Sequence, residues 1–248
     1  MARPLLVFDL DGTLSLIRHG WQSVMAGVMT EALAESMPGR AGLPEFARTV
    51  VDATNGSPVV RQMEALSEQA TASGGAAIDA PAWARVYQDR MQATMDSRKV
   101  SIPPESLLVP GAAIFVARAR RAGFACALVS GSSAANVESD LAFLDLDAMF
   151  DGLVRSPLDP AAPNSFSKEQ VFRDLMAECG VRSLVAFGDG PGEIRAAVAS
   201  GGKGVGVAHT PGTGAIDAAL SASLSKAGAS LVVADFIDLR CWRAIGAI

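Results

Sequence analysis

The stretch Leu5-Leu6-Val7-Phe8-Asp9-Leu10-Asp11-Gly12-Thr13-Leu14 decides how the rest of this chain is interpreted. Its apolar run has the length of a strand and ends abruptly at two aspartates that one leucine separates. Side chains two residues apart on an extended chain point to the same side, so we expect the Asp9 and Asp11 carboxylates to share one space at a strand end. Two adjacent anions repel each other, which favours a cation or a proton transfer in that space. A plain acidic turn is the alternative, because Asp and Gly are common in turns.

The composition of the 248-residue chain excludes several classes of protein. Half of the residues are hydrophobic and 19% are charged, which is typical of a globular protein. The net charge of −5 offers no basic surface to nucleic acid or to an anionic membrane, so we expect neither as a partner. Two histidines are too few for a multi-histidine zinc site, and three scattered cysteines favour a reducing cytoplasm. The apolar run 5–8 is too short for a signal sequence or a membrane span.

Two patterns of hydrophobic residues divide the chain. Residues 15–106 carry no strand signal, and their apolar spacings of three and four residues predict helices near 24–33, 58–72 and 83–91. From Pro110 onward, helical segments alternate with short apolar strands predicted at 125–129, 150–154, 184–187, 204–208 and 231–233. Fully apolar strands separated by helices are typical of a parallel sheet covered on both faces. The sequence therefore predicts an α/β protein with a helical insertion.

Polar side chains follow several of the predicted strands at their carboxyl ends. Asp9 and Asp11 follow the first strand, Ser130 follows the second, and Asp189 follows the strand at 184–187. Lys168 opens the helix that comes after the third strand and its loop. Parallel sheets bind ligands beyond these strand ends, where the strand order reverses. If the strands are neighbours, three acids, one hydroxyl and one ammonium group converge, which predicts a metal-assisted phosphoryl-transfer site.

These residues resemble, in chain order, the four motifs of the haloacid dehalogenase superfamily. The resemblance spans nearly the whole chain and is carried by Asp9-x-Asp11-Gly12-Thr13, Ser130, Lys168 and the Gly-Asp-Gly-Pro-Gly-Glu run at 188–193. It implies a Rossmann-like core formed by residues 1–14 and 107–248. It also implies that residues 15–106 form an inserted all-helical cap domain of the C1 type, which acts as a mobile lid.

The resemblance also implies a role for each motif residue. Asp9 would be the nucleophile that forms an aspartyl phosphate, and Asp11 would be the general acid and base. Dehalogenases resemble the first motif but lack the second aspartate, so Asp11 favours phosphoryl transfer. Lys168 would neutralise the charge shared by Asp9 and the phosphoryl group. Ser130 and the backbone N–H of Gly131 would bind phosphate oxygens, aided by the following helix N-terminus.

Magnesium is the cofactor that this resemblance implies. The carboxylates of Asp9 and Asp189 are hard oxygen ligands of the kind that Mg²⁺ prefers, and the backbone carbonyl of Asp11 would complete the protein's share. Glu193 stands where many relatives have Asp. It would either hold the metal through water or complement the N-terminus of its helix.

Residues that recognise the substrate are expected in the cap, where the sequence carries fewer signals. Arg18 and His19 follow the first motif closely, and an arginine there would clamp a second anionic group of the substrate. The alternative is a surface Arg and His without a role in binding. Arg61 and Gln62 begin a predicted cap helix, where a solvated helical face is the preferred interpretation.

We therefore expect a cytoplasmic, Mg²⁺-dependent phosphatase, monomeric or homodimeric, whose substrate is a small phosphorylated metabolite such as a sugar phosphate or similar polyol phosphate. A phosphosugar mutase is the first alternative, because mutases with C1 caps carry the same four motifs. A catalytically silent metabolite-binding protein is an alternative from another class. Release of inorganic phosphate separates the phosphatase from both.

Overall fold

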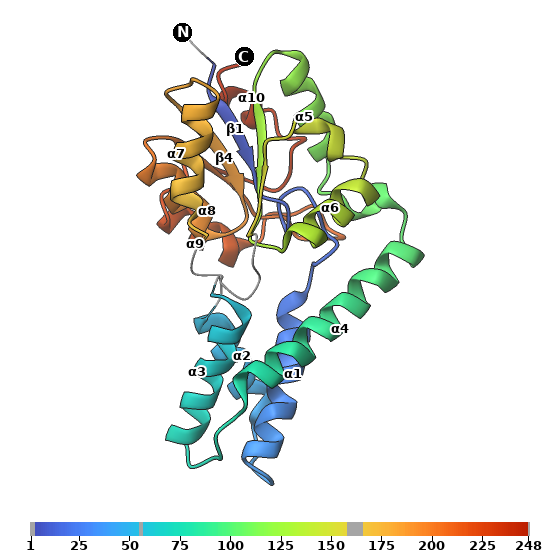
Figure 1. Ribbon diagram of the computed structural model, residues 1–248, viewed down its shortest axis with the longest axis vertical. Helices are drawn as coiled ribbons and strands as arrows, with labels where there is room; N and C mark the ends of the chain where they lie inside the picture. The colour runs from blue at the N-terminus through green and yellow to red at the C-terminus, as the bar shows by residue number, and fades with distance from the viewer. Residues whose placement is uncertain (1–2, 55–56, 158–165, 248) are drawn as a thin grey trace. The chain divides into compact units, whose positions relative to one another are not determined.

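The computed structural model describes residues 3–54, 57–157 and 166–247, and the chain divides into two compact units (Figure 1). Unit 1 comprises Met1–Ile17 and Ile102–Ile248, and unit 2 comprises Arg18–Ser101. The first unit is therefore built from two separate parts of the sequence. In the described ranges, no helix combines the length and the apolar character needed to cross a membrane.

Unit 1 is built on a parallel sheet with the strand order β3-β2-β1-β4-β5-β6. The strands are β1 (Leu5–Phe8), β2 (Cys126–Val129), β3 (Val154–Arg155), β4 (Leu184–Gly188), β5 (Lys203–Val207) and β6 (Leu231–Val233). Leu6 of β1 lies opposite Cys126 of β2 on one side and opposite Val185 of β4 on the other. The chain therefore extends the sheet in both directions from β1, and the predicted α/β class with a parallel sheet is confirmed.

Helices cover both faces of this sheet. They are α5 (Ala112–Arg121), α6 (Ala134–Phe143), α7 (Lys168–Glu178), α8 (Pro191–Ala199), α9 (Ala218–Lys226) and α10 (Arg240–Ala244), with 3₁₀ turns η1 (Pro104–Leu107) and η2 (Asp147–Met149). Figure 1 shows α7 and α8 on one side of β1 and β4, and α5 on the other.

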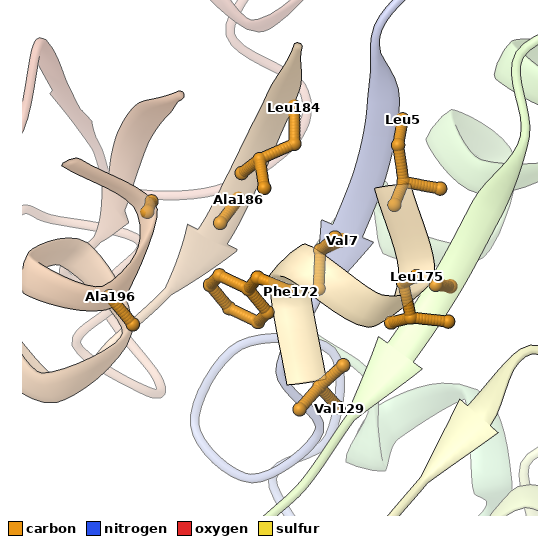
Figure 2. Close-up of a cluster of buried hydrophobic side chains, with 10 residues drawn as sticks. Leu5, Val7, Val129, Phe172, Leu175, Leu184, Ala186 and Ala196 are labelled. Atoms are coloured by element: carbon orange, nitrogen blue, oxygen red, sulfur yellow. The ribbon is translucent and has the colours of Figure 1, made fainter. Parts of the chain in front are cut away.

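Alternate residues of the central strands enter two different cores. Leu5 and Val7 of β1 lie in a cluster with Phe172 and Leu175 of α7, which Figure 2 shows in front of the strands. Ala186 of β4 faces the same cluster. Successive side chains of a strand point to opposite faces, so the residues between these face the other core.

Aromatic rings fill the second core. Phe8 of β1 stacks on Phe187 of β4 with ring centroids 5.1 Å apart, and it meets the edge of Phe115 of α5 at 6.2 Å. Phe115 also packs against Trp242 of α10 at 4.5 Å. Both faces of the central strands are therefore buried, which explains why those strands are apolar throughout.

Three elements of unit 1 differ from the sequence prediction. The strand predicted at 150–154 is shorter and later, because Phe150 ends η2 and packs its ring against Phe8 at 6.3 Å. Helices α9 and α10 were not predicted. Asp217 caps α9 by accepting the backbone N–H of Leu220, and this capping residue was the local sign of that helix.

Unit 2 consists of α1 (Trp21–Ser36), α2 (Leu43–Ala53), α3 (Val59–Ala72) and α4 (Ala80–Ser101), and its described residues contain no strand. The sequence did not predict α2. Its buried residues Leu43, Ala47, Val50 and Val51 follow helical spacing, and Pro44 stands in its first turn. The spacing of these residues indicates a helix, but its apolar stripe is short and the helix was not predicted.

Candidate active site

The site lies at the carboxyl ends of β1 and β4, which are neighbours in the sheet. Phe8 and Phe187 pair across these strands, and the backbone N–H of Asp9 donates to the carbonyl of Phe187 at 3.0 Å. Asp9 therefore leaves β1 beside the end of β4, which Asp189 follows directly. The strand order reverses at β1, and open α/β sheets bind their ligands at this point.

Lys168 joins two carboxylates of the site. Its Nζ donates to Asp9 Oδ1 at 2.8 Å and also forms an ion pair with the carboxylate of Glu193. The lysine is the first residue of α7, and Ser167 caps that helix by accepting the backbone N–H of Gln170. The cap determines where α7 starts, and it thereby places the ammonium group over the end of β1.

Thr13 connects the first strand end to Asp189. Its buried Oγ1 accepts the backbone N–H of Asp189 at 2.9 Å and donates to Asp189 Oδ1 at 3.4 Å. The loop between Asp9 and Thr13 also has to admit this carboxylate. Gly12 adopts φ +76°, and a Cβ atom on it would collide with the Asp189 carboxylate. Position 12 therefore needs glycine because its φ is positive and because a side chain there would leave no room for the Asp189 carboxylate.

A second glycine makes room for Glu193. This glutamate lies in the first turn of α8, and its Oε2 occupies the space that a Cβ atom on Gly190 would need. The other oxygen, Oε1, contacts Lys168. The sequence left open whether Glu193 binds metal or complements the helix N-terminus. Its direct partner in the structure is the lysine.

Burial and charge shift the pKa values in this cluster. Burial raises the pKa of Asp9 to about 7, since the neighbouring charge of Lys168 only partly offsets desolvation. Burial, followed by repulsion from Asp9 and Glu193, raises the pKa of Asp189 well above its usual value. For Lys168 burial acts in the opposite direction, but the charges of Asp9 and Glu193 prevail and raise its pKa. The lysine therefore stays an ammonium group beside the carboxyl groups of Asp9 and Glu193.

The donor chemistry of this cluster suits a hard divalent cation. Asp9 and Asp189 offer buried carboxylate oxygens, and a cation would offset the burial and the repulsion that raise their pKa values. Among the described residues, no three His, Cys, Asp or Glu side chains already form a metal-binding group. The absence of three grouped ligands does not conflict with a Mg²⁺ site, because Mg²⁺ keeps several waters and is usually held by one or two carboxylates together with substrate phosphate.

Ser130 and Gly131 lie at the end of β2, the other neighbour of β1. The backbone N–H of Ser130 donates to the carbonyl of Arg155, and its buried Oγ accepts the backbone N–H of Ser132 at 3.1 Å. Gly131 is exposed. Ser133 then caps α6 by accepting the backbone N–H of Asn136. The turn from strand to helix is thus held by its own hydroxyl groups.

Asp11 has a partner that sequence reasoning missed. Ser132 Oγ donates to Asp11 Oδ2 at 2.7 Å across a separation of 121 residues. The contact of Thr13 with Asp189 was not predicted from the sequence either. Hydroxyl groups near strand ends were the only local signal, and serines and threonines are too common for that signal to single out these two. The strand order brings Asp9, Asp11, Lys168 and Asp189 into one region, as expected.

Arg18 and His19 belong to unit 2, whereas the residues at the strand ends belong to unit 1. Arg18 Nη1 donates to the sulfur of Met95 in α4 at 2.9 Å, and His19 is exposed. The expectation of a solvated face was wrong for Gln62, which is buried with its amide donating to the carbonyl of Ser57.

The fold and site together define an α/β protein whose acidic and lysine side chains gather at the point where the strand order of a parallel sheet reverses. Residues 4–201 match the family model of the haloacid dehalogenase-like hydrolases, and the chain belongs to that family. The predicted resemblance is confirmed at this level. Among curated protein sequences, none matches the chain at a significant level.

Solved structures of low sequence identity share the fold. A haloacid dehalogenase family hydrolase from Deinococcus radiodurans R1, solved with bound phosphate and sodium, is 21% identical with a TM-score of 0.62, over 99% of this chain and 97% of that chain. A candidate beta-phosphoglucomutase from Thermotoga maritima is 18% identical with a TM-score of 0.60, over 97% and 98%. A predicted phosphoglycolate phosphatase from Haemophilus somnus 129PT is 16% identical with a TM-score of 0.62, also over 97% and 98%.

Proposed function

We propose that this chain is a Mg²⁺-dependent phosphatase that hydrolyses a small phosphorylated metabolite, such as a sugar phosphate or similar polyol phosphate. The observation that carries the proposal is the contact of Lys168 with Asp9 at the end of β1, with Asp11 two residues further on. A carboxylate nucleophile, a second carboxyl group for proton transfer and a fixed cation are the groups that phosphoryl transfer through an aspartyl phosphate requires.

The reaction has two balanced steps. A carboxylate oxygen of Asp9 attacks phosphorus, and the bond from phosphorus to the ester oxygen breaks as Asp11 passes its proton to that oxygen. The alcohol leaves, and Asp9 carries the phosphoryl group. Water then attacks phosphorus and gives a proton to Asp11 as the bond to Asp9 breaks. Inorganic phosphate is released and both carboxyl groups return to their starting states.

Three groups would hold the phosphoryl moiety during these steps. Lys168 stays charged beside Asp9 and would neutralise the oxygens of the transferring group. Ser130 and the Gly131 N–H would bind the remaining oxygens from the end of β2, which pairs with β1. The Deinococcus radiodurans protein holds phosphate in a similar fold, which supports a phosphate ligand for this family member as well.

Asp9, Asp189 and the backbone carbonyl of Asp11 are the groups that we assign to Mg²⁺. When bound, the ion would neutralise charge on the phosphoryl oxygens and keep the nucleophilic carboxylate ionised. Glu193 would contribute through its Oε2, since Lys168 occupies its Oε1. We assign unit 2 the role of the cap domain and Arg18 and His19 that of substrate contacts. A cytoplasmic location and a monomeric or homodimeric state belong to the same proposal.

The phosphosugar mutase stays the second candidate, because a candidate beta-phosphoglucomutase shares the fold over nearly the whole of both chains. A screen of phosphorylated metabolites for phosphate release tests the first candidate against the second. Stoichiometric phosphate from one sugar phosphate supports the phosphatase. Conversion of one phosphosugar isomer into another without release of phosphate supports the mutase.

The metal has its own test, which does not depend on turnover. Mg²⁺ should raise the melting temperature of the chelator-treated protein, and Asp189→Asn should remove this response. The same substitution should raise the melting temperature of the metal-free protein, because it removes a carboxyl group whose charged form is disfavoured by burial and by repulsion from Asp9. In activity assays, chelation should inactivate the enzyme, and Mg²⁺ but not Ca²⁺ should restore it, since the shell of Ca²⁺ is larger and looser. Full activity in excess chelator would contradict the metal assignment.

A further inference from the structure

The two acids of the first motif are held by partners of different chemistry. Asp9 accepts from the ammonium group of Lys168 at 2.8 Å, whereas Asp11 accepts from the hydroxyl of Ser132 at 2.7 Å. An ammonium group only donates hydrogen bonds and carries a charge that favours the carboxylate form. A hydroxyl group is neutral and can donate to a carboxylate or accept from a carboxylic acid. Each partner therefore suits a different chemical task.

Ser132 is itself held in place from two directions. Its backbone N–H donates to Ser130 Oγ at 3.1 Å, at the end of β2, and the next residue, Ser133, caps α6. β2 pairs with β1 in register, with Leu128 opposite Phe8, so the two strand ends are tied together through the sheet. A serine in this turn is thus a fixed support from which a hydroxyl reaches Asp11.

We propose that Ser132 is a positioning residue for Asp11. Its hydroxyl holds one oxygen of the Asp11 carboxyl group, so that the group keeps a single orientation while the proton passes to the leaving oxygen and later returns from water. This inference rests on the proposed function, because Asp11 has a proton to transfer only if the chain performs phosphoryl transfer. The orientation of the Asp11 carboxyl group would then depend on the loop after β2, which carries Ser132, as well as on its own loop after β1.

The dependence of the rate on the leaving group distinguishes positioning of the acid from other roles. The alkoxide leaving group of a primary alkyl phosphate needs a proton, whereas p-nitrophenyl phosphate releases the stable p-nitrophenolate anion, which needs little help from an acid. With saturating Mg²⁺, Ser132→Ala should lower kcat/KM for the alkyl ester about ten- to a hundredfold, and for the aryl ester about twofold. Ser132→Thr, which keeps a hydroxyl, should recover most of the loss.

Ser133→Ala is the matched control, because it removes a neighbouring hydroxyl that caps α6 and does not contact Asp11. It should lower the melting temperature and leave the ratio of the two kcat/KM values unchanged. Should Ser132→Ala not fold, Ser132→Cys tests the same point, since a thiol of similar size is a weak donor.

Four results would overturn the assignment. Equal losses on both esters, expressed in KM, would identify Ser132 as a phosphate contact instead. Unchanged kinetics of Ser132→Ala would show that Asp11 needs no such support. If the wild-type enzyme releases phosphate and an Asp11→Asn variant releases it at the same rate, the inference is refuted, while the proposed phosphatase activity stands. A wild-type protein that processes neither ester would overturn the proposed function, and this inference with it.

Discussion

Unit 1 and unit 2 pair their polar side chains in different ways. In unit 1 the contacts at the strand ends join residues that are far apart in the sequence. Lys168 reaches Asp9 across 159 residues, and Ser132 reaches Asp11 across 121. These contacts are partly buried, and each includes an acid that follows β1. The partly buried contacts of these two acids thus meet at one edge of the sheet, while other ion pairs of unit 1, such as Arg155 with Glu178, lie on the surface.

Two ion pairs of unit 2 lie on its surface. Arg61 pairs with Glu64 one helical turn away, and Arg90 of α4 pairs with Glu31 of α1, with all four side chains substantially exposed. The described interior of unit 2 is mainly apolar, as at Leu66, and the polar residues buried in it are Ser36 and Gln62. Unit 1 therefore holds the acidic and lysine side chains of the candidate site in a partly buried polar cluster, whereas the core of unit 2 is mainly apolar.

The largest effect should follow from the nucleophile. Asp9→Asn should lower kcat at least about a thousandfold, because an amide cannot form the acyl phosphate although it keeps the shape of the side chain. Phosphate release by the purified variant measures this. The control is Glu31→Gln, the same change of acid to amide in an exposed pair of unit 2, which should leave kcat unchanged. Activity of Asp9→Asn within tenfold of wild type would refute the assignment of the nucleophile.

The next effect should come from the core of unit 2. Leu66 is fully buried in α3, and Leu66→Ala should lower the free energy of unfolding by about 2–5 kcal/mol through lost burial and the resulting cavity. Urea unfolding followed by circular dichroism measures the change. Val60→Ala on the same helix removes methyl groups from an exposed position and should cost less than about 0.5 kcal/mol. Equal effects of the two substitutions would contradict the importance of the apolar core.

A smaller effect is expected from the proposed substrate clamp. Arg18→Ala should raise KM for the true substrate and lower kcat/KM about ten- to a hundredfold, the loss of one charge-assisted hydrogen bond of about 1.5–3 kcal/mol. p-Nitrophenyl phosphate has no remote group to hold and should be hardly affected. Arg48→Ala, at an exposed arginine of α2, is the control for charge alone. Equal losses on both substrates would mean that Arg18 supports the fold, for instance through Met95.

The smallest effect should come from the surface pair of Arg90 and Glu31. Arg90→Ala should lower the free energy of unfolding by less than about 1 kcal/mol, because both charges are solvated and screened. The difference from wild type should vanish in about 1 M salt, where the Debye length is about 3 Å. Urea titrations at low and high salt measure both quantities. A larger loss that persists in salt would show that unit 2 also depends on its ion pairs.

Local patterns of hydrophobic residues were sufficient to predict the central strands. The central strands were visible because both faces of β1 and β4 are buried, which makes them apolar at every position. Short elements were misplaced or missed. The two-residue β3 lies at the end of the strand predicted at 150–154, and the five-residue α10 was not predicted, because each is too short to repeat its pattern of hydrophobic residues. For the same reason the boundary at Phe150 was wrong, since an apolar ring in a 3₁₀ turn resembles one in a strand.

The sequence by itself determined the class of sheet and the family, and it predicted the reactive acids, because Asp9 and Asp11 directly follow the apolar strand of a recognisable motif. Tertiary structure alone decided which side chains hold those acids. Ser132 contacts Asp11, and Thr13 contacts Asp189, across 121 and 176 residues, only because β1 lies between β2 and β4. Strand order depends on how the whole sheet packs, and no local pattern of hydrophobic residues encodes it.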